Sequence, residues 1–266
     1  MIKPLKIDDV FAKIDDNKKH MEFISTGFPS LDVFLEGGFL RRELVVVGAQ
    51  TGVGKSIFAG HFFHGAAKQG FNCAYFSLEI SNEMIVSRLL ANDSDISPTK
   101  IMSGQLQPYE EEKVSNSKAK IGVYSSFMTF YDEVYLLEEI LSEIKTKEYD
   151  FIVIDFIQNV MSFGDKEYDR LSRVALELQK IAKERNCCIL ILSQLSNFVG
   201  RMGQQEKFLE YKGSGNIATV CDLGFFVERD ESVPNRNHIT LRKNRRGTSG
   251  NKVIITYEYP SGVLHE

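Results

Sequence analysis

Several features that mark membrane or secreted proteins are missing from this 266-residue sequence. It has no run of about eighteen apolar residues, the length that a membrane-spanning helix needs. Its first residues, Met1–Phe11, lack the apolar centre of a signal peptide. The six prolines are scattered, and no internal repeat or low-complexity tract divides the chain. We therefore expect no membrane partner and a cytoplasmic location.

The cysteines exclude two further kinds of structure. Cys73, Cys187, Cys188 and Cys221 show neither a CxxC pair nor the Cys/His spacing of a zinc site or a disulfide framework. Each lies in an apolar stretch, so we expect buried, reduced thiols. The net charge of −4 gives no overall basic field, and any site for a polyanion must therefore be local.

Short apolar runs alternate with helical patterns from Ile24 onward. Strands are predicted at Glu43–Gly48, Asn72–Ser77, Ile121–Tyr124, Phe151–Asp155, Cys188–Ser193, Leu223–Val227, His238–Arg242 and Lys252–Tyr257. Helices are predicted at Lys55–Lys68, Asn82–Ala91, Glu133–Lys147 and Tyr168–Arg185. This alternation predicts an α/β fold, with a mainly parallel central sheet flanked by helices and antiparallel C-terminal strands.

A glycine-rich segment lies between the first of these strands and a helix, the context that a P-loop requires. Gly52 and Gly54 let the backbone curl so that several N–H groups point at one anion, and the helix adds its positive end. Lys55 can reach the β- and γ-phosphates, and Ser56 can ligate Mg²⁺. Ala49 replaces the first glycine of the strict pattern. The predicted ATP-binding residues are Ala49, Gln50, Thr51, Gly52, Val53, Gly54, Lys55 and Ser56.

Three polar residues stand where predicted strands end. Asp155 follows the apolar run 151–154, and a carboxylate at the C-terminal end of a buried strand lies beside the phosphate loop in this class of sheet. We therefore expect Asp155 to hold Mg²⁺ together with Ser56. Glu79 and Gln194 follow two other strands, and each is a candidate to orient or deprotonate the attacking water.

Taken together, these segments resemble the motor domain of DnaB-type hexameric replicative helicases over residues 24–266. The segments that carry the resemblance are Ser25-Thr26-Gly27-Phe28-Pro29-Ser30-Leu31-Asp32, Gly37-Gly38, the P-loop, Phe76-Ser77-Leu78-Glu79, Ile154-Asp155-Phe156-Ile157-Gln158, Leu192-Ser193-Gln194-Leu195 and Lys243-Asn244-Arg245. Many NTPases share the P-loop, whereas the later segments in this order are more discriminating. In that family the first P-loop glycine is often alanine, so Ala49 fits.

The resemblance implies a RecA-like fold and a ring of six identical subunits with ATP at each interface. It implies that Glu79 is the catalytic base and that Gln194 senses the γ-phosphate and relays its state to DNA loops. Lys243 and Arg245 would reach across the interface, with Arg245 as the arginine finger that stabilises charge on the transferring phosphoryl group. Arg246 is a competing candidate for the finger.

The long segment 196–216 is the predicted contact with single-stranded DNA. It is glycine-rich, polar and long for a connection, which is typical of a functional or disordered loop. Small residues let main-chain N–H groups approach phosphates, and cations supply salt-dependent affinity. A mobile surface loop without DNA is the alternative. The candidate DNA-binding residues are Arg201, Lys207, Lys212, Gly213, Ser214 and Gly215.

Residues 1–23 differ from the predicted motor domain. Ile7, Val10, Phe11 and Ile14 form one apolar stripe of a short helix whose other faces are charged. Such a helix needs a surface, either on its own domain or, as a linker helix, on a neighbouring subunit.

The resemblance also implies a primase or a helicase loader as a partner. Bacterial replicative helicases carry a separate N-terminal domain that we do not find here, so we expect a stand-alone motor, as a virus or mobile element encodes, or a fragment.

Three functions compete. The leading hypothesis is an ATP-dependent, ring-forming DNA helicase that translocates on single-stranded DNA and unwinds duplex during replication. The second is a RecA/RadA/KaiC-like ATPase that acts in recombination or regulation without unwinding, because segment 25–38 also resembles that group. The third is a non-catalytic ATP-binding partner of another helicase, against which the presence of Glu79, Gln194 and Arg245 argues.

Overall fold

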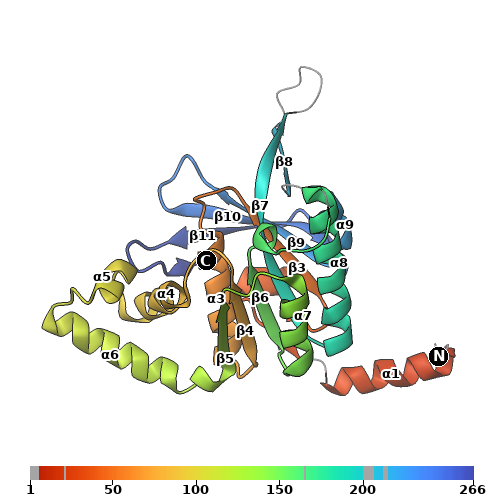
Figure 1. The fold of residues 1–266 in the computed structure, drawn as a ribbon, viewed down its shortest axis with the longest axis horizontal. Helices are drawn as coiled ribbons and strands as arrows, with labels where there is room; N and C mark the ends of the chain where they lie inside the picture. Colours follow the sequence, from red (N-terminus) through yellow and green to blue (C-terminus); the bar gives the residue numbers. More distant parts are fainter. Residues whose placement is uncertain (1–5, 21, 165, 200–206, 212–214) are drawn as a thin grey trace.

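A large β-sheet runs through the centre of the protein, with helices on both faces (Figure 1). The computed structural model describes residues 6–20, 22–164, 166–199, 207–211 and 215–266. The strands follow one another across the sheet in the order β12-β11-β10-β9-β3-β7-β6-β4-β5, and β8 pairs with β7. Their bounds are β3 (Leu44–Ala49), β4 (Cys73–Ser77), β5 (Met128–Asp132), β6 (Phe151–Asp155), β7 (Cys188–Val199), β8 (Lys207–Tyr211), β9 (Leu223–Arg229), β10 (Arg236–Asn244), β11 (Lys252–Tyr257) and β12 (Leu264–His265).

The middle of the sheet is parallel and one side is antiparallel. β3 pairs in parallel with β7 and β9, β6 with β7 and β4, and β4 with β5. β10, β11 and β12 pair antiparallel beyond β9. This arrangement confirms the predicted α/β fold. It also brings the C-terminal ends of β3, β4, β6, β7 and β9 to one edge of the sheet, where loops can build a site.

Alternate residues of each central strand fill two apolar cores. In β3, Val45 and Val47 pack into a core with helix α3 (Lys55–Lys68). Leu44 and Val46 point the other way, into a core with α7 (Leu137–Thr146) and α8 (Glu167–Arg185). Burial on both faces is the reason why these strands are continuously apolar in sequence. The four cysteines are free and buried, as predicted.

The remaining helices lie at the periphery. Helices α4, α5 and α6 project on the side of the molecule opposite to α1 (Figure 1). Their bounds are α1 (Ile7–His20), α2 (Pro29–Phe34), α4 (Asn82–Ser94), α5 (Pro98–Ser103), α6 (Pro108–Gly122) and α9 (Gly215–Val220); short 3₁₀ turns occupy Ser125–Phe127 and Ile157–Asn159, and β1 (Phe23–Ile24) pairs with β2 (Phe39–Leu40). Throughout the described part of the chain, no helix combines the length and apolarity needed to cross a membrane.

One predicted strand is wrong. The helix α6 includes residues 121 and 122, and residues 123 and 124 follow its end. This helix begins with a proline and a capping box between Gln107 and Glu110. The edge strand is β5, a few residues later, where Phe130 packs into the α3 core and Tyr131 stacks on Phe76 with ring centroids 4.5 Å apart. The capped helix is therefore formed in place of the strand that the short apolar pattern at 121–124 predicts, and Val123 is 83% exposed.

The predicted loop 196–216 is also partly wrong. β7 continues to Val199 and pairs antiparallel with β8, so that Leu195 lies opposite Tyr211 and Val199 opposite Lys207. This two-stranded ribbon projects from the sheet (Figure 1). The first residue of α9 is Gly215, so the segment ends in a helix. The candidate DNA-binding residues Arg201, Lys212, Gly213 and Ser214 lie outside the described residues.

Candidate active site

The loop between β3 and α3 has the backbone of an anion site. Gly52 has φ +81° and Gly54 has φ +102°, a region that side-chain-bearing residues rarely adopt. Gly54 is the N-cap of α3, and no side chain caps the first turn of this fourteen-residue helix. Its first N–H groups, at the positive end of the helix, are therefore available to an anion.

A cavity of about 260 Å³ opens over this loop. It brings Lys55 and Ser56 of the loop together with Glu79 and Gln194, two predicted residues that lie far from the loop in the sequence. The side-chain amide of Gln194 donates a hydrogen bond of 2.7 Å to the Thr51 hydroxyl on the loop. The contact follows from the register, because Gln194 lies opposite Ala49, the last residue of β3. Arg88 and Phe156 also line the cavity, and the sequence reasoning did not select them.

Asp155 lies at the floor of this site and is fully buried. The Tyr75 hydroxyl donates to its Oδ2 at 2.8 Å, while Oδ1 is buried without a hydrogen-bond partner among the described residues. Burial raises the pKa of Asp155, and the neighbouring hydroxyls of Ser56 and Tyr75 act in the opposite direction. A buried carboxylate oxygen left unpaired beside Ser56 fits a Mg²⁺ ligand. Such an ion keeps several waters and substrate phosphates and needs only one or two protein ligands.

Lys55 carries the positive charge of the site. Desolvation by burial lowers the pKa of its ammonium group, and the nearby Glu79 and Asp155 carboxylates raise it. Its Nζ lies 5.9 Å from the centre of the Phe156 ring. The structure thus places a partly desolvated cation between the loop and two acids, an arrangement that would favour a polyphosphate.

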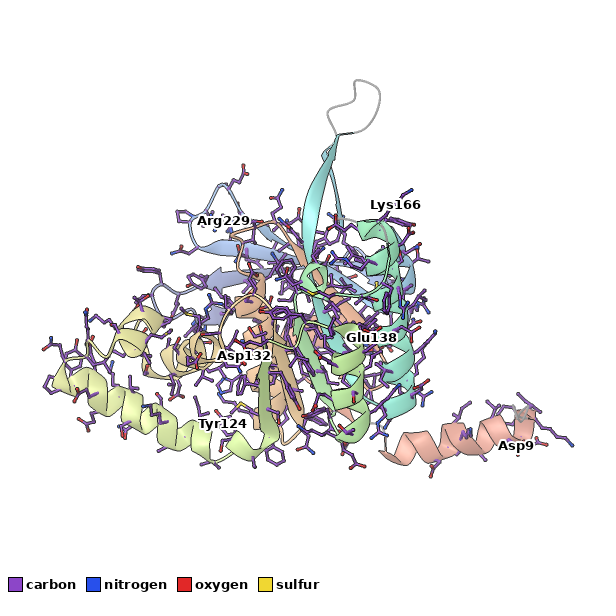
Figure 2. The ribbon with its side chains drawn as sticks, viewed as in Figure 1. Asp9, Tyr124, Asp132, Glu138, Lys166 and Arg229 are labelled. Atoms are coloured by element: carbon purple, nitrogen blue, oxygen red, sulfur yellow. The ribbon has the colours of Figure 1, made fainter. Side chains whose placement is uncertain are left out.

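A second cavity, of about 490 Å³, adjoins the other side of the loop and shares Gly52 and Gly54 with the first. It is lined by Arg229, Asn237 and Tyr257, among others. Arg229, labelled in Figure 2, is the last residue of the parallel strand β9. Its guanidinium donates to the Gly52 carbonyl at 2.9 Å. The sequence reasoning missed this cavity, because Asn237 and Tyr257 lie in the antiparallel strands β10 and β11 and only tertiary pairing brings these strands to the loop.

Lys243 and Arg245 lie at the other edge of the sheet. Lys243 pairs with Gly224, which also pairs with Val46, and the Arg245 amide donates to the Asp222 carbonyl. Arg245 is therefore level with the start of β3, about 17 Å from its end at 3.3 Å per residue. The predicted interface cations and the phosphate loop of one chain are not brought together.

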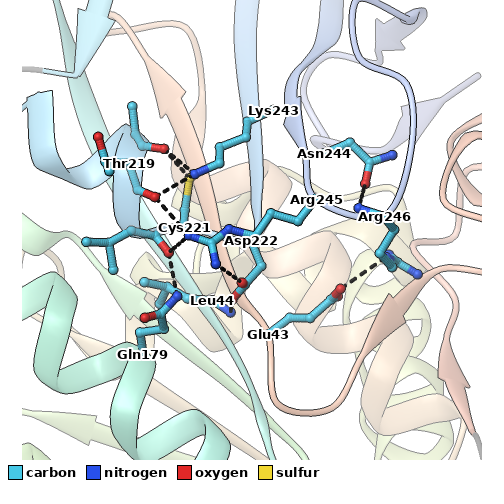
Figure 3. Close-up of polar contacts among 12 residues, drawn as sticks. Glu43, Leu44, Gln179, Thr219, Cys221, Asp222, Lys243, Asn244, Arg245 and Arg246 are labelled. Carbon is cyan, nitrogen blue, oxygen red and sulfur yellow. Dashed lines mark hydrogen bonds and ion pairs between the residues drawn. The ribbon is translucent and has the colours of Figure 1, made fainter.

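Arg245 and Arg246 differ in their partners (Figure 3). Arg246 faces the buried Glu43 carboxylate at 3.0 Å and donates to the carbonyls of Leu35 and Gly38 at 2.9 and 2.8 Å. Its side chain is 20% exposed, against 46% for Arg245. Arg246 is thus bound within its own domain, whereas Arg245 is the more accessible of the two.

The sheet, the loop and the buried acid define a P-loop NTPase with a RecA-like fold. The chain belongs to the DnaB-like helicase C terminal domain family, whose model matches residues 23–260. It is 29% identical over 261 residues to the replicative DNA helicase DnaC of Bacillus subtilis, covering 91% of this chain and 56% of that protein. A replicative DNA helicase DnaB of Geobacillus stearothermophilus is 29% identical over 246 residues, covering 85% of this chain and 53% of that one. The chain thus spans about half the length of these curated relatives.

Solved structures agree on the fold. A DnaB-like replicative helicase, described together with its interactions with primase, superposes with a TM-score of 0.81 at 20% identity, covering 98% of this chain and 67% of that one. The RadB recombinase superposes less well, with a TM-score of 0.59 at 19% identity over 91% of this chain and 98% of its own. Membership of the helicase family favours the first of the three functions over the RecA/RadA alternative.

Proposed function

We propose that this chain is the ATP-hydrolysing motor of a ring-forming DNA helicase, which translocates on single-stranded DNA and unwinds duplex during replication. The observation that carries the proposal is the separation of Arg245 from its own phosphate loop. Because β10 runs antiparallel to β9, Arg245 lies at the edge of the sheet opposite to the phosphate loop. An Arg245 that stabilises the phosphates of ATP must therefore reach the loop of a neighbouring subunit. A head-to-tail ring provides such a neighbour at every interface.

Within one subunit, the phosphates of ATP would lie on the amides of residues 51–56. Ser56 and the unpaired Oδ1 of Asp155 would hold Mg²⁺, which neutralises charge on the phosphates. Glu79 is exposed and lines the same cavity, and it is the proposed acceptor of the proton of the attacking water. Lys243 and Arg245 of the adjacent copy would complete the site.

Gln194 is proposed to report the state of the nucleotide. Its present partner, the Thr51 hydroxyl, is a neutral acceptor that a γ-phosphate oxygen can replace with a stronger, charge-assisted hydrogen bond. Because Gln194 lies in β7, a change in its position passes directly into the projecting β7–β8 ribbon. The ribbon and the adjoining residues up to Gly215 are the proposed contact with DNA.

We assign the nucleoside to the second cavity. It begins at the same glycines as the phosphate cavity, and it offers an aromatic ring, Tyr257, and the guanidinium of Arg229. Both groups can stack on the flat face of a base.

Helix α1 is proposed to dock on an adjacent subunit. Ile7, Phe11 and Ile14 are 63%, 55% and 47% exposed, so none of the other described residues covers the apolar stripe. The helix points away from the sheet, with Asp9 near its far end (Figure 2). A second copy of the chain is the proposed occupant of this stripe. A primase or loader partner stays a prediction of the family resemblance.

The decisive experiment is strand displacement on a forked duplex with ATP and Mg²⁺, combined with ATP turnover with and without single-stranded DNA. We expect unwinding and DNA-stimulated turnover. If the protein neither unwinds the fork nor responds to single-stranded DNA, the helicase function is wrong. A Glu79→Gln variant with unchanged turnover would instead support the non-catalytic function.

A further inference from the structure

Main-chain carbonyls at the end of α9 hold the two interface cations. The Lys243 ammonium donates to the carbonyls of Ala218 and Thr219 at 2.6 and 2.7 Å, and the Arg245 guanidinium donates to that of Thr219 at 2.9 Å (Figure 3). The last carbonyls of a helix have no partner within the helix and carry the negative end of its dipole. Asp222 adds a longer ion pair of 3.5 Å to Arg245.

Both ends of α9 are fastened to α8. At the C-terminal end, the Gln179 side-chain amide donates to the Val220 carbonyl at 2.6 Å. At the N-terminal end, the Asn216 amide donates to the Ser172 hydroxyl at 3.0 Å. Between them, Ile217 is fully buried in the core. This six-residue helix, about 9 Å long, is therefore attached to the rest of the domain at both ends and in the middle.

The contacts of Lys243 and Arg245 are of a kind that a phosphate can replace. Neutral carbonyls make weaker hydrogen bonds to a cation than an ionised phosphate does. Arg246 next to them provides the internal comparison, since it is bound to the Glu43 carboxylate and to two carbonyls. The carbonyls at the end of α9 therefore orient the Lys243 and Arg245 side chains through hydrogen bonds that a phosphate can displace.

We propose that Gln179 is a positioning residue that acts through α9. By holding Val220, it orients the carbonyls that aim Arg245 at the next subunit, and the same helix transmits movement of the DNA segment to Arg245. α9 lies beside β8, so a shift of the ribbon can reach the carbonyls through this one short helix. The inference rests on the proposed roles of Arg245 and of segment 196–216.

The test uses replacements of Gln179 that keep its size and lose its N–H donor. Gln179→Met and Gln179→Glu are compared with Glu177→Gln, a control on the same helix that removes only a surface pair with Lys180. ATP turnover is measured with and without an oligo-dT strand, together with KM for ATP. For both Gln179 variants we expect the ratio of stimulated to unstimulated turnover to fall about threefold to tenfold, the worth of one hydrogen bond. KM should change less than about twofold, because the phosphate loop is untouched.

A merely structural role would lower both rates alike and leave their ratio unchanged. An unchanged ratio in a folded Gln179→Met ring would therefore overturn the inference. If that variant does not fold, Ser172→Ala decides, because it releases the other end of α9 and alanine favours the helix α8. Ser172→Ala should also lower the ratio of stimulated to unstimulated turnover. An unchanged ratio in this variant would likewise overturn the inference. Loss of DNA stimulation in the unmodified protein, or full turnover by Arg245→Ala, would instead refute the proposed function.

Discussion

Two inactive variants should restore each other's activity if each ATP site draws on two subunits. Lys55→Ala disables the phosphate loop of its own subunit and keeps Arg245, whereas Arg245→Ala has the opposite effect. When the two are mixed in equal amounts, about one quarter of the interfaces in random head-to-tail rings combine an intact loop with an intact Arg245. The mixture should therefore recover up to that share of the turnover.

The size of each single effect follows from the contacts. Arg245→Ala should lower turnover at saturating ATP by about 10³-fold or more, the usual worth of an arginine finger. Its free energy of unfolding should change by only about 1 kcal/mol, because the side chain is 46% exposed. Arg246→Ala should instead lower this free energy by about 3 kcal/mol, because the largely buried Glu43 carboxylate loses its cationic partner.

The assay is steady-state ATP turnover across mixing ratios, with ring assembly followed by particle mass in the presence of an ATP analogue and single-stranded DNA. Recovery should peak near equal amounts. If mixed rings form and the turnover remains the sum of the two variants, then Arg245 does not act across the interface. If Arg246→Ala folds normally and loses turnover while Arg245→Ala keeps it, the finger is Arg246.

Three further outcomes are expected. Glu79→Gln should retain ATP binding, measured by titration with a fluorescent analogue, and lose turnover by at least about 10²-fold; loss of binding would argue against a role as base. Phe11→Asp should weaken ring assembly, measured by particle mass, whereas Lys13→Asp on the charged face should not; equal effects would argue against apolar docking of α1. Burial lowers the pKa of His61 and His64 to about 4, so the unfolded chain takes up their protons at higher pH than the folded protein. The free energy of unfolding should therefore fall between about pH 6.5 and 4, by up to about 3 kcal/mol per histidine, and His64→Gln should flatten the melting temperature over this range.

Local chemistry made much of the site predictable. The glycines of the P-loop are required by backbone dihedrals at two positions, and the flanking β-branched run and helix are set by near neighbours in the chain. Asp155 ends the buried strand β6, and Gln194 follows the apolar part of β7, so both positions are visible in the sequence pattern. Parallel pairing then brings such residues to one edge, and Gln194 lies opposite Ala49 as a direct consequence.

Local patterns failed where two segments compete. Residues 121–124 look like a strand in isolation, but the helix α6, which is capped at Gln107, extends to Gly122. The polar composition of segment 196–216 indicates a loop, yet antiparallel pairing between β7 and β8 satisfies the backbone of much of it. Such pairing depends on the register between two separate segments of the chain, and the amino-acid composition of one segment does not reveal it.

The sequence by itself determined the strand–loop–helix that is proposed to bind phosphate, together with the acids near it, because dihedral preference and apolar periodicity act over a few residues. Only the tertiary structure distinguished Arg245 from Arg246, two identical side chains side by side in the chain. Arg246 bonds to Leu35, 211 residues away, while Arg245 rests on the end of α9. Such partners are set by how the sheet brings remote segments together, and this is why they emerge only once the whole chain has folded.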